Sequence, residues 1–92
     1  MSVAVEFPSA LQRFVGDQKI VEVAPGTVKT AFEALAKDYS GLRDQLYDEH
    51  GKIRSFVNIY LNDEDIRYSD NLETPLKDGD VIQIVPSIAG GR

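Results

Sequence analysis

The stretch Pro25-Gly-Thr-Val-Lys-Thr-Ala-Phe-Glu-Ala-Leu-Ala-Lys-Asp-Tyr-Ser-Gly41 decides the fold, because its apolar residues recur at helical spacing. Thr27 stands where a helix N-cap belongs, and its hydroxyl can accept a hydrogen bond from an amide of the first turn. Apolar side chains then follow at intervals of three and four, at Val28, Ala31, Phe32, Leu35 and Tyr39. The pattern predicts one amphipathic helix that ends near Ser40-Gly41.

Two strands are expected before this helix. Residues 3–7 alternate with period two, so Val3, Val5 and Phe7 should face inward, and Pro8 ends the strand. Residues 19–23 form the second strand, and we expect a hairpin turn at Val15-Gly16-Asp17 to join the two. The chain therefore opens with an antiparallel pair.

Three strands are expected after the helix. They cover residues 53–61, 66–68 and 81–85, and Pro86 closes the last one. Residues 62–65 read as a turn, residues 72–76 as a loop and Asp78-Gly79 as a tight turn. Leu42 and Leu46 lie four apart, which indicates a helical turn that tucks both leucines under the connection.

Two hairpins joined by one crossover helix must bury one face of a sheet beneath that helix. If the crossover is right-handed, the first and last strands lie side by side in the centre of a mixed sheet. The predicted fold class is therefore α+β, a ubiquitin-like β-grasp with four to five strands packed on one main helix. Residues 1–92 form a single domain in this reading, with residues 86–92 as an extended tail.

Composition excludes several classes of function. The 42% hydrophobic and 27% charged fractions are those of a soluble globule, and the net charge of −5 disfavours nucleic acid as a partner. Neither a membrane span nor a signal peptide is recognisable, so no membrane partner is expected. The chain has no cysteine, which fits a cytoplasmic setting and requires any thiol chemistry to come from a partner.

No catalytic set emerges from the residues, so we expect that the chain is not itself an enzyme. His50 lies in a polar turn and reads as a solvated residue. The cluster Asp63-Glu64-Asp65 lacks the ligand spacing of a calcium loop and reads as a strand-to-strand turn. Gly79, Gly90 and Gly91 make no phosphate loop, and we expect no metal and no bound cofactor.

Strand parity predicts a docking face. If Val57, Ile59 and Leu61 are core residues, the alternate positions of that strand point away from the helix. The same parity on the last strand turns Ile82 and Ile84 inward and Val81, Gln83 and Val85 outward. An apolar patch on a charged surface is typical of a docking site. The residues predicted to dock a partner are Phe56, Tyr60, Val81, Val85 and Pro86.

The ending Pro-Ser-Ile-Ala-Gly-Gly-Arg, residues 86–92, is the second feature that indicates function. Residues 86–91, if extended, reach roughly 20 Å from the sheet. A tip without side chains can enter a channel too narrow for any Cβ. A glycine carboxylate there is inert until it is activated, and conversion to an acyl-adenylate lets a sulfur or amine nucleophile attack it. The arm then carries an acyl group between the active sites of other enzymes.

Residues 76–91, Leu-Lys-Asp-Gly-Asp-Val-Ile-Gln-Ile-Val-Pro-Ser-Ile-Ala-Gly-Gly, resemble the C-terminal signature of the ThiS/MoaD family of sulfur carriers. In that signature an Asp-Gly-Asp turn precedes a strand, a proline and a terminal diglycine. Residues 56–67, Phe-Val-Asn-Ile-Tyr-Leu-Asn-Asp-Glu-Asp-Ile-Arg, look more specifically like the CysO-type carriers of cysteine biosynthesis. The resemblance covers nearly the whole chain.

The resemblance implies that a ubiquitin-activating-like enzyme uses ATP to adenylate the terminal glycine, which then becomes a thiocarboxylate. Gly91 would carry the acyl group, and Gly90 would give access to it. A cysteine-synthase-like enzyme would accept the sulfur. Family precedent also places the partner-facing surface on the exposed sheet face, where Val85 is expected. Arg92 departs from the mature pattern, so we expect a metal-dependent protease to remove it first, unless it was added to the natural sequence.

Two other functions are compatible with the same C-terminal tail. A ubiquitin-like modifier would join Gly91 to lysines of other proteins, and the small subunit of molybdopterin synthase would form a tight complex with a larger subunit. Nothing upstream of Gly91 separates the modifier from the sulfur carrier, because the two differ only in the final nucleophile.

Overall fold

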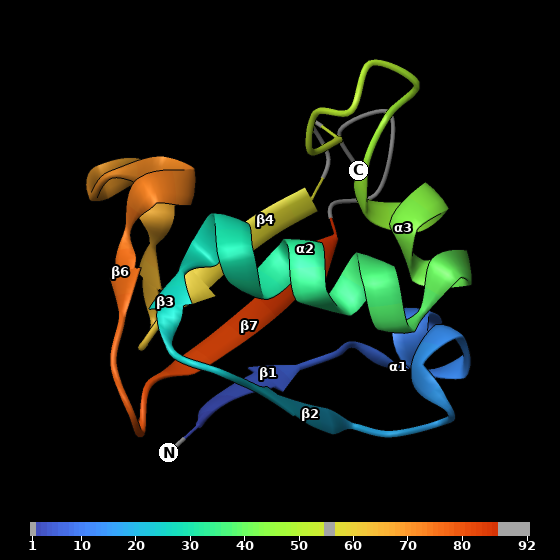
Figure 1. Ribbon diagram of the computed structural model, residues 1–92, viewed down its shortest axis with the longest axis horizontal. Coiled ribbons are helices and arrows are strands. Elements are labelled where there is room, and N and C mark those ends of the chain that lie inside the picture. Colours follow the sequence, from blue (N-terminus) through green and yellow to red (C-terminus); the bar gives the residue numbers. More distant parts are fainter. Residues whose placement is uncertain (1, 55–56, 87–92) are drawn as a thin grey trace.

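The computed structural model describes residues 2–54 and 57–86, and its centre is a five-stranded sheet (Figure 1). The strand order is β2-β1-β7-β4-β5, and β1 and β7 are the parallel neighbours in the middle, as predicted. Every other neighbouring pair in this sheet is antiparallel. The strands are β1 (Val3–Glu6), β2 (Ile20–Val23), β4 (Val57–Leu61), β5 (Glu64–Asp65) and β7 (Val81–Pro86).

Helix α2 (Val28–Asp38) lies across one face of this sheet, followed by α3 (Ser40–Leu46) (Figure 1). The predicted cap is confirmed: Thr30 N donates to Thr27 Oγ1 at 3.2 Å, and Thr27 N donates to Thr30 Oγ1 at 2.9 Å. This reciprocal pair satisfies two amides at the helix start. A two-stranded ladder of β3 (Gly26–Thr27) and β6 (Pro75–Leu76) ties that start to the later part of the chain.

The core forms between α2, α3 and the inner face of the sheet. Val3 and Val5 of β1 and Ile82 of β7 are fully buried, and Phe32 of α2 is fully buried as well. Leu42 and Leu46 of α3 are also fully enclosed, which confirms the predicted helical turn. The arrangement is the predicted β-grasp: one helical layer on one face of a mixed sheet.

The predicted hairpin turn between the first two strands is wrong. The connection contains α1 (Ser9–Gln12) and the 3-10 helix η1 (Arg13–Val15), and it turns at Gly16 and Asp17, where φ is 68° and 62°. Leu11 and Val15 are buried and four residues apart, so this short helical segment closes one end of the core. The strands it joins nevertheless pair antiparallel as expected.

The helix predicted to end near Ser40-Gly41 ends at Asp38, two residues earlier, and the glycine does not end it, because Gly41 lies inside α3. The break comes at Tyr39, whose φ of −131° and ψ of 84° interrupt the helical backbone for one residue. The chain changes direction at Tyr39, and no glycine with a positive φ is needed there. Burial of Leu42 on the same core as Leu35 gives the reason for a second helix directly after the first.

The third predicted strand is shorter than residues 53–61. β4 begins at Val57, Ile53 forms only an isolated bridge to Tyr47, and residues 55–56 lie outside the described residues. Asn62 and Asp63 both have positive φ, 50° and 73°, which is the backbone of a two-residue type I′ hairpin. The chain therefore pairs again at once through β5.

The predicted short strand 66–68 is instead the 3-10 helix η2 (Ile66–Tyr68). The antiparallel return that was placed there comes two residues earlier, at Glu64 and Asp65. The predicted loop 72–76 contains the end of a further 3-10 helix, η3 (Asn71–Glu73), and strand β6. The Asp78-Gly79 turn is confirmed, with Gly79 at φ 90°, a conformation that suits glycine.

Candidate functional site

The outer face of the sheet is the candidate docking site, and strand register defines it. One row of partners crosses four strands and contains Ile20, Glu6, Gln83 and Tyr60. Side chains that are partners in register point to the same face, and the next row along contains the inward-facing Val5 and Ile82. The first row therefore faces away from α2.

Val85 is the most exposed apolar residue that β7 presents on this face. Its partner in register is Asn58, and 46% of Val85 is exposed although it lies in a central strand. Val81 and Tyr60 lie on the same face and are half-buried. The parity prediction thus holds for Tyr60, Val81 and Val85, while Phe56 lies outside the described residues.

Ile20 belongs to the same face and was missed in the sequence analysis. It is 44% exposed and pairs with Glu6, at the β2 end of the row. The signal was available: Val21 and Val23 pair with the buried Val5 and Val3, so parity turns Ile20 outward. Adding Ile20 widens the apolar part of the face beyond the third and last strands.

Polar groups interrupt the apolar part of this face. Gln83 Nε2 donates to Glu6 Oε1 at 3.2 Å, which joins β7 to β1 across the middle of the row. A surface that mixes exposed apolar side chains with hydrogen-bonded polar side chains is typical of a reversible interface, because such a surface is stable both in water and against a partner.

An ion pair borders the face at the β5 edge. Arg67 Nη2 lies 2.6 Å from Asp65 Oδ2, and Arg67 Nε donates to both carboxylate oxygens at 3.1 Å. These side-chain hydrogen bonds and the Arg67 backbone amide lower the pKa of Asp65, and Asp65 in turn raises the pKa of Arg67. The pair fixes the segment after β5, where Asp65 is the partner of Tyr60 in register.

A polar clamp holds the beginning of β7. Val81 N donates to Asn62 Oδ1 at 3.0 Å, and Asn62 Nδ2 donates to Asp80 Oδ1 at 3.1 Å. The Lys77 amide donates to Asp80 Oδ2 at 2.8 Å, and this bond is the largest cause of a lowered pKa of Asp80. Residues 81–83 of β7 are paired with β1, and residues 82–86 are paired with β4.

The residues predicted to carry the chemistry do not fall within the described part of the chain. Gly90, Gly91 and Arg92 lie outside the described residues, so their assignment stays a prediction. Pro86 is described as the last residue of β7 and pairs with Val57. The structure therefore places Pro86, and the roles of Gly90, Gly91 and Arg92 rest on chemical argument.

Of the cluster set aside in the sequence analysis, Asp63 lies in the two-residue turn, but Glu64 and Asp65 form strand β5 instead of the predicted turn. The His50 side chain is 73% exposed and lies 3.6 Å from Glu49 Oε2, and Gly79 lies in the tight turn before β7. Across residues 2–54 and 57–86, no group of three or more His, Asp or Glu side chains could hold a metal ion. No helix in the same residues is long and apolar enough to cross a membrane.

Comparison with known proteins identifies the family. The ThiS family profile matches residues 5–91, which is nearly the whole chain. The chain belongs to the ThiS family. This ThiS-family chain is 42% identical to the sulfur carrier protein CysO of Mycobacterium tuberculosis over 93 aligned positions, covering 99% of this chain and all of that protein.

A solved structure supports the same assignment. The crystal structure of the BexX/CysO complex of Amycolatopsis orientalis contains a chain that matches this ThiS-family chain with a TM-score of 0.85 and 38% identity, covering 97% of this chain and 99% of that one. The small archaeal modifier protein 3 of Haloferax volcanii is 28% identical over 93 positions, covering 99% of this chain and all of that protein. The relatives thus include both sulfur carriers and a protein modifier.

Proposed function

We propose that this chain is a sulfur carrier whose Gly91 becomes a C-terminal thiocarboxylate after removal of Arg92. The observation that carries the proposal is the diglycine sequence, separated by three residues from the end of β7, in a β-grasp chain similar over its full length to CysO sulfur carriers. Because of that similarity, we expect the sulfur to be used for cysteine biosynthesis. The described residues contribute recognition and reach, and partner enzymes contribute catalysis.

The proposed chemistry proceeds in two steps at the glycine carboxyl group. An oxygen of the Gly91 carboxylate attacks the α-phosphorus of ATP in a ubiquitin-activating-like enzyme, and pyrophosphate leaves. A sulfur nucleophile then attacks the acyl carbon and AMP leaves, so that one C–S bond replaces one C–O bond. A cysteine-synthase-like enzyme is the proposed acceptor of that sulfur. ATP binds to the activating partner in this scheme.

Arg92 must be removed before activation, because its peptide bond occupies the carboxyl group of Gly91. A metal-dependent protease is the proposed agent. We propose further that the activating enzyme docks on the outer sheet face at Tyr60, Val81 and Val85, since β7 ends at Pro86, one residue after Val85. Exposed apolar residues in the centre of a polar surface are the usual anchors of such contacts.

The test compares the intact chain with a chain that ends at Gly91. Each is incubated with ATP and the activating enzyme from the same source, and pyrophosphate is measured. We expect release only with the chain that ends at Gly91. Release while Arg92 remains attached would overturn the processing step, and no release from either chain would overturn adenylation.

The modifier similarity favours one second candidate, conjugation of Gly91 to lysine side chains of other proteins. Mass spectrometry of the chain from its native cells separates the two. A gain of about 16 Da on the trimmed chain means that sulfur has replaced oxygen at the activated carbonyl. Adducts of many larger masses mean isopeptide conjugates and favour the modifier.

A further inference from the structure

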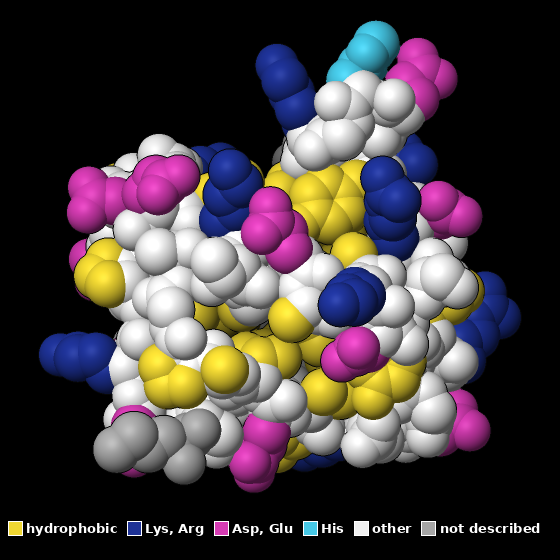
Figure 2. All heavy atoms as spheres, in the orientation of Figure 1, with side chains coloured by type: hydrophobic (Ala, Val, Ile, Leu, Met, Phe, Trp, Pro, Cys, Tyr) yellow, Lys and Arg dark blue, Asp and Glu magenta, His cyan; other side chains and the backbone are white. Residues whose placement is uncertain are grey.

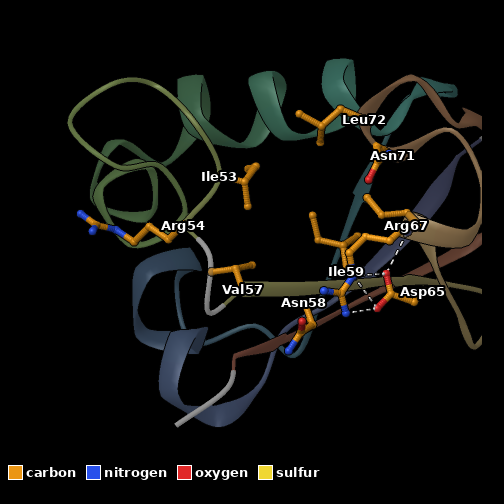
Figure 3. Close-up of a pocket in the computed structure, with 10 residues that line it drawn as sticks. Ile53, Arg54, Val57, Asn58, Ile59, Asp65, Arg67, Asn71 and Leu72 are labelled. Carbon is orange, nitrogen blue, oxygen red and sulfur yellow. Dashed lines mark hydrogen bonds and ion pairs between the residues drawn. The ribbon is translucent and has the colours of Figure 1, made fainter. Parts of the chain in front are cut away.

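Two hollows lie beside the helical layer of the molecule, and the first of them also reaches the β4–β5 edge of the sheet. One, of about 420 Å³, lies between β4 and residues 65–72 (Figure 3). The other, of about 510 Å³, lies between α2 and residues 43–51. Leu72 lines both hollows, so they lie next to each other on either side of this residue, and we call the two together the basic groove. Each hollow is open to solvent rather than enclosed.

The basic groove gathers the cations of an acidic protein. Its lining contains five of the nine Lys and Arg residues that the structure describes: Lys29, Lys37, Arg43, Arg54 and Arg67. Only two of the fifteen acidic residues, Glu33 and Asp65, line it as well. Figure 2 shows Lys and Arg side chains around an apolar patch above α2. A positive area on a chain of net charge −5 attracts anions selectively.

The five cations do not contribute equally to the positive charge of the basic groove. Arg67 is neutralised by its ion pair with Asp65. Arg54 lies at the rim, points away from the centre of the first hollow in Figure 3, and donates from Nε to the Asp44 carbonyl at 3.1 Å. Lys29, Lys37 and Arg43 surround the second hollow with Glu33 as the one carboxylate. The positive excess is therefore strongest beside α2.

The floor of the groove is apolar. Tyr47, Ile53 and Leu72 are half-buried and pack against the hydrophobic core. Burial is the largest cause of a raised pKa of Tyr47, and Glu33 adds to it against the opposing effect of Arg43. An apolar floor under a basic rim fits a ligand that has apolar side chains between carboxylates.

We infer that the basic groove binds an acidic segment of a partner protein that carries at least one apolar side chain among its carboxylates. An extended segment can follow both hollows across Leu72 and reach cations in each, whereas a compact anion fills only one. The inference does not rest on the chemistry of the tail. Because the second hollow lies beside α2, on the side of the sheet opposite Val85, a segment bound in that hollow leaves Val85 free for a second protein.

The test uses the full chain, labelled with ¹⁵N, and a synthetic peptide Glu-Glu-Leu-Glu-Glu-Phe-Glu-Glu. Addition of the peptide at low salt should shift amide signals of residues 29–37, 43–54, 57–59 and 65–72 and leave the amides of β1, β2 and β7 unmoved. The triple variant Lys29→Glu, Lys37→Glu, Arg43→Glu should bind about tenfold more weakly or worse, since each exposed pair contributes modestly and three are reversed.

The matched control reverses three cations outside the groove, Arg13→Glu, Lys19→Glu and Lys77→Glu, and so has the same net charge. It should lose no more than about twofold in affinity, by long-range repulsion that salt screens. Equal losses in both triple variants would overturn the proposal. So would saturation of the same amides by citrate at the same affinity, or shifts of amide signals in β1, β2 or β7. If the first triple variant does not fold, glutamine replaces glutamate at those three positions.

Discussion

Gly26 and Thr30 form the closest contact at the start of α2. A Cβ built on Gly26 would lie 2.5 Å from Thr30 Oγ1, which is inside van der Waals contact. Thr30 cannot simply turn its hydroxyl away, because Oγ1 accepts from Thr27 N and also donates to the Thr27 carbonyl at 2.9 Å. Glycine is thus required at position 26 because the hydrogen bonds of Thr30 hold Oγ1 too close to where a Cβ would lie, and not because of an unusual φ.

We predict that Gly26→Ala lowers the free energy of unfolding by about 1 kcal/mol, the typical contribution of a helix cap. In a Thr30→Ala background the same change should be neutral or slightly stabilising, because the obstructing oxygen is gone and alanine restricts the unfolded chain. Urea unfolding of the four proteins in this double-mutant cycle measures both effects. Additive costs would show that the contact with Thr30 is not the cause.

Val85 is the residue on which the proposed docking depends. We predict that Val85→Lys, made in the chain that ends at Gly91, slows pyrophosphate release at limiting carrier concentration by about tenfold, because a charge replaces a central apolar anchor. The free energy of unfolding should change by less than about 0.5 kcal/mol, since Val85 is 46% exposed.

Tyr68→Lys is the matched control for Val85→Lys. Tyr68 is also an apolar residue on the surface, 82% exposed, but it lies in η2 beyond the edge of the sheet. Its substitution should leave activation unchanged. Equal slowing by the two variants would mean that added charge, not loss of a docking contact, explains the effect.

At the scale of elements, the sequence correctly predicted those features that hydrophobic spacing and helix capping determine. The core face of α2, the inward residues of β1 and β7 and the central parallel pair all follow from spacing. The failures are at connections. Residues 9–15 are helical because Leu11 and Val15 close the core; their spacing of four is the same signal that located the turn of Leu42 and Leu46, and the sequence analysis did not apply it to this segment.

Gly41 offers a direct test of the corrected helix boundary. A terminating glycine would have a positive φ, and alanine there would destabilise the protein. Gly41 instead lies inside α3, and a Cβ would meet Phe14 Cδ1 at 3.4 Å, a contact that the ring can tolerate. We predict that Gly41→Ala raises the free energy of unfolding by up to about 1 kcal/mol.

Gly79→Ala is the opposite case and serves as the comparison. Gly79 has φ 90° in the turn before β7, so alanine there should lower the free energy of unfolding by about 1 kcal/mol. Thermal or urea unfolding of both variants decides the matter. Loss of stability in Gly41→Ala would favour strain against Phe14 or a helix end after all.

At the scale of the whole molecule, the two functional surfaces differ in how far sequence could predict them. Parity along two strands was enough to find the face of Val85 and Tyr60, although Ile20 required the register of a third strand. The basic groove could not be found that way. Its cations come from α2, from α3 and from residues 54 and 67, and only the folded chain brings them around Leu72.

The same fold makes stability depend on pH through three aspartates. Asp48, Asp65 and Asp80 all have a pKa below the ordinary aspartate value of 3.8, chiefly because N–H groups donate to their carboxylates. A carboxylate with a lowered folded-state pKa stabilises the fold above its unfolded pKa, and that contribution is lost as the pH falls through the folded value. The protein should therefore lose stability on acidification below about 3.8.

We predict that Asp80→Asn is less stable than the unchanged protein at neutral pH and that this difference shrinks as the pH falls below the ordinary value of 3.8. Protonation of Asp80 weakens its bonds from the Lys77 amide and Asn62 in the unchanged protein, so the two proteins converge. Gly79→Ala, a neighbouring substitution that does not titrate, should show a difference independent of pH. Urea unfolding across the acid range measures all three proteins. A constant gap for Asp80→Asn would mean that the clamp at the start of β7 does not depend on the Asp80 charge, and that Asp48 and Asp65 account for the acid sensitivity.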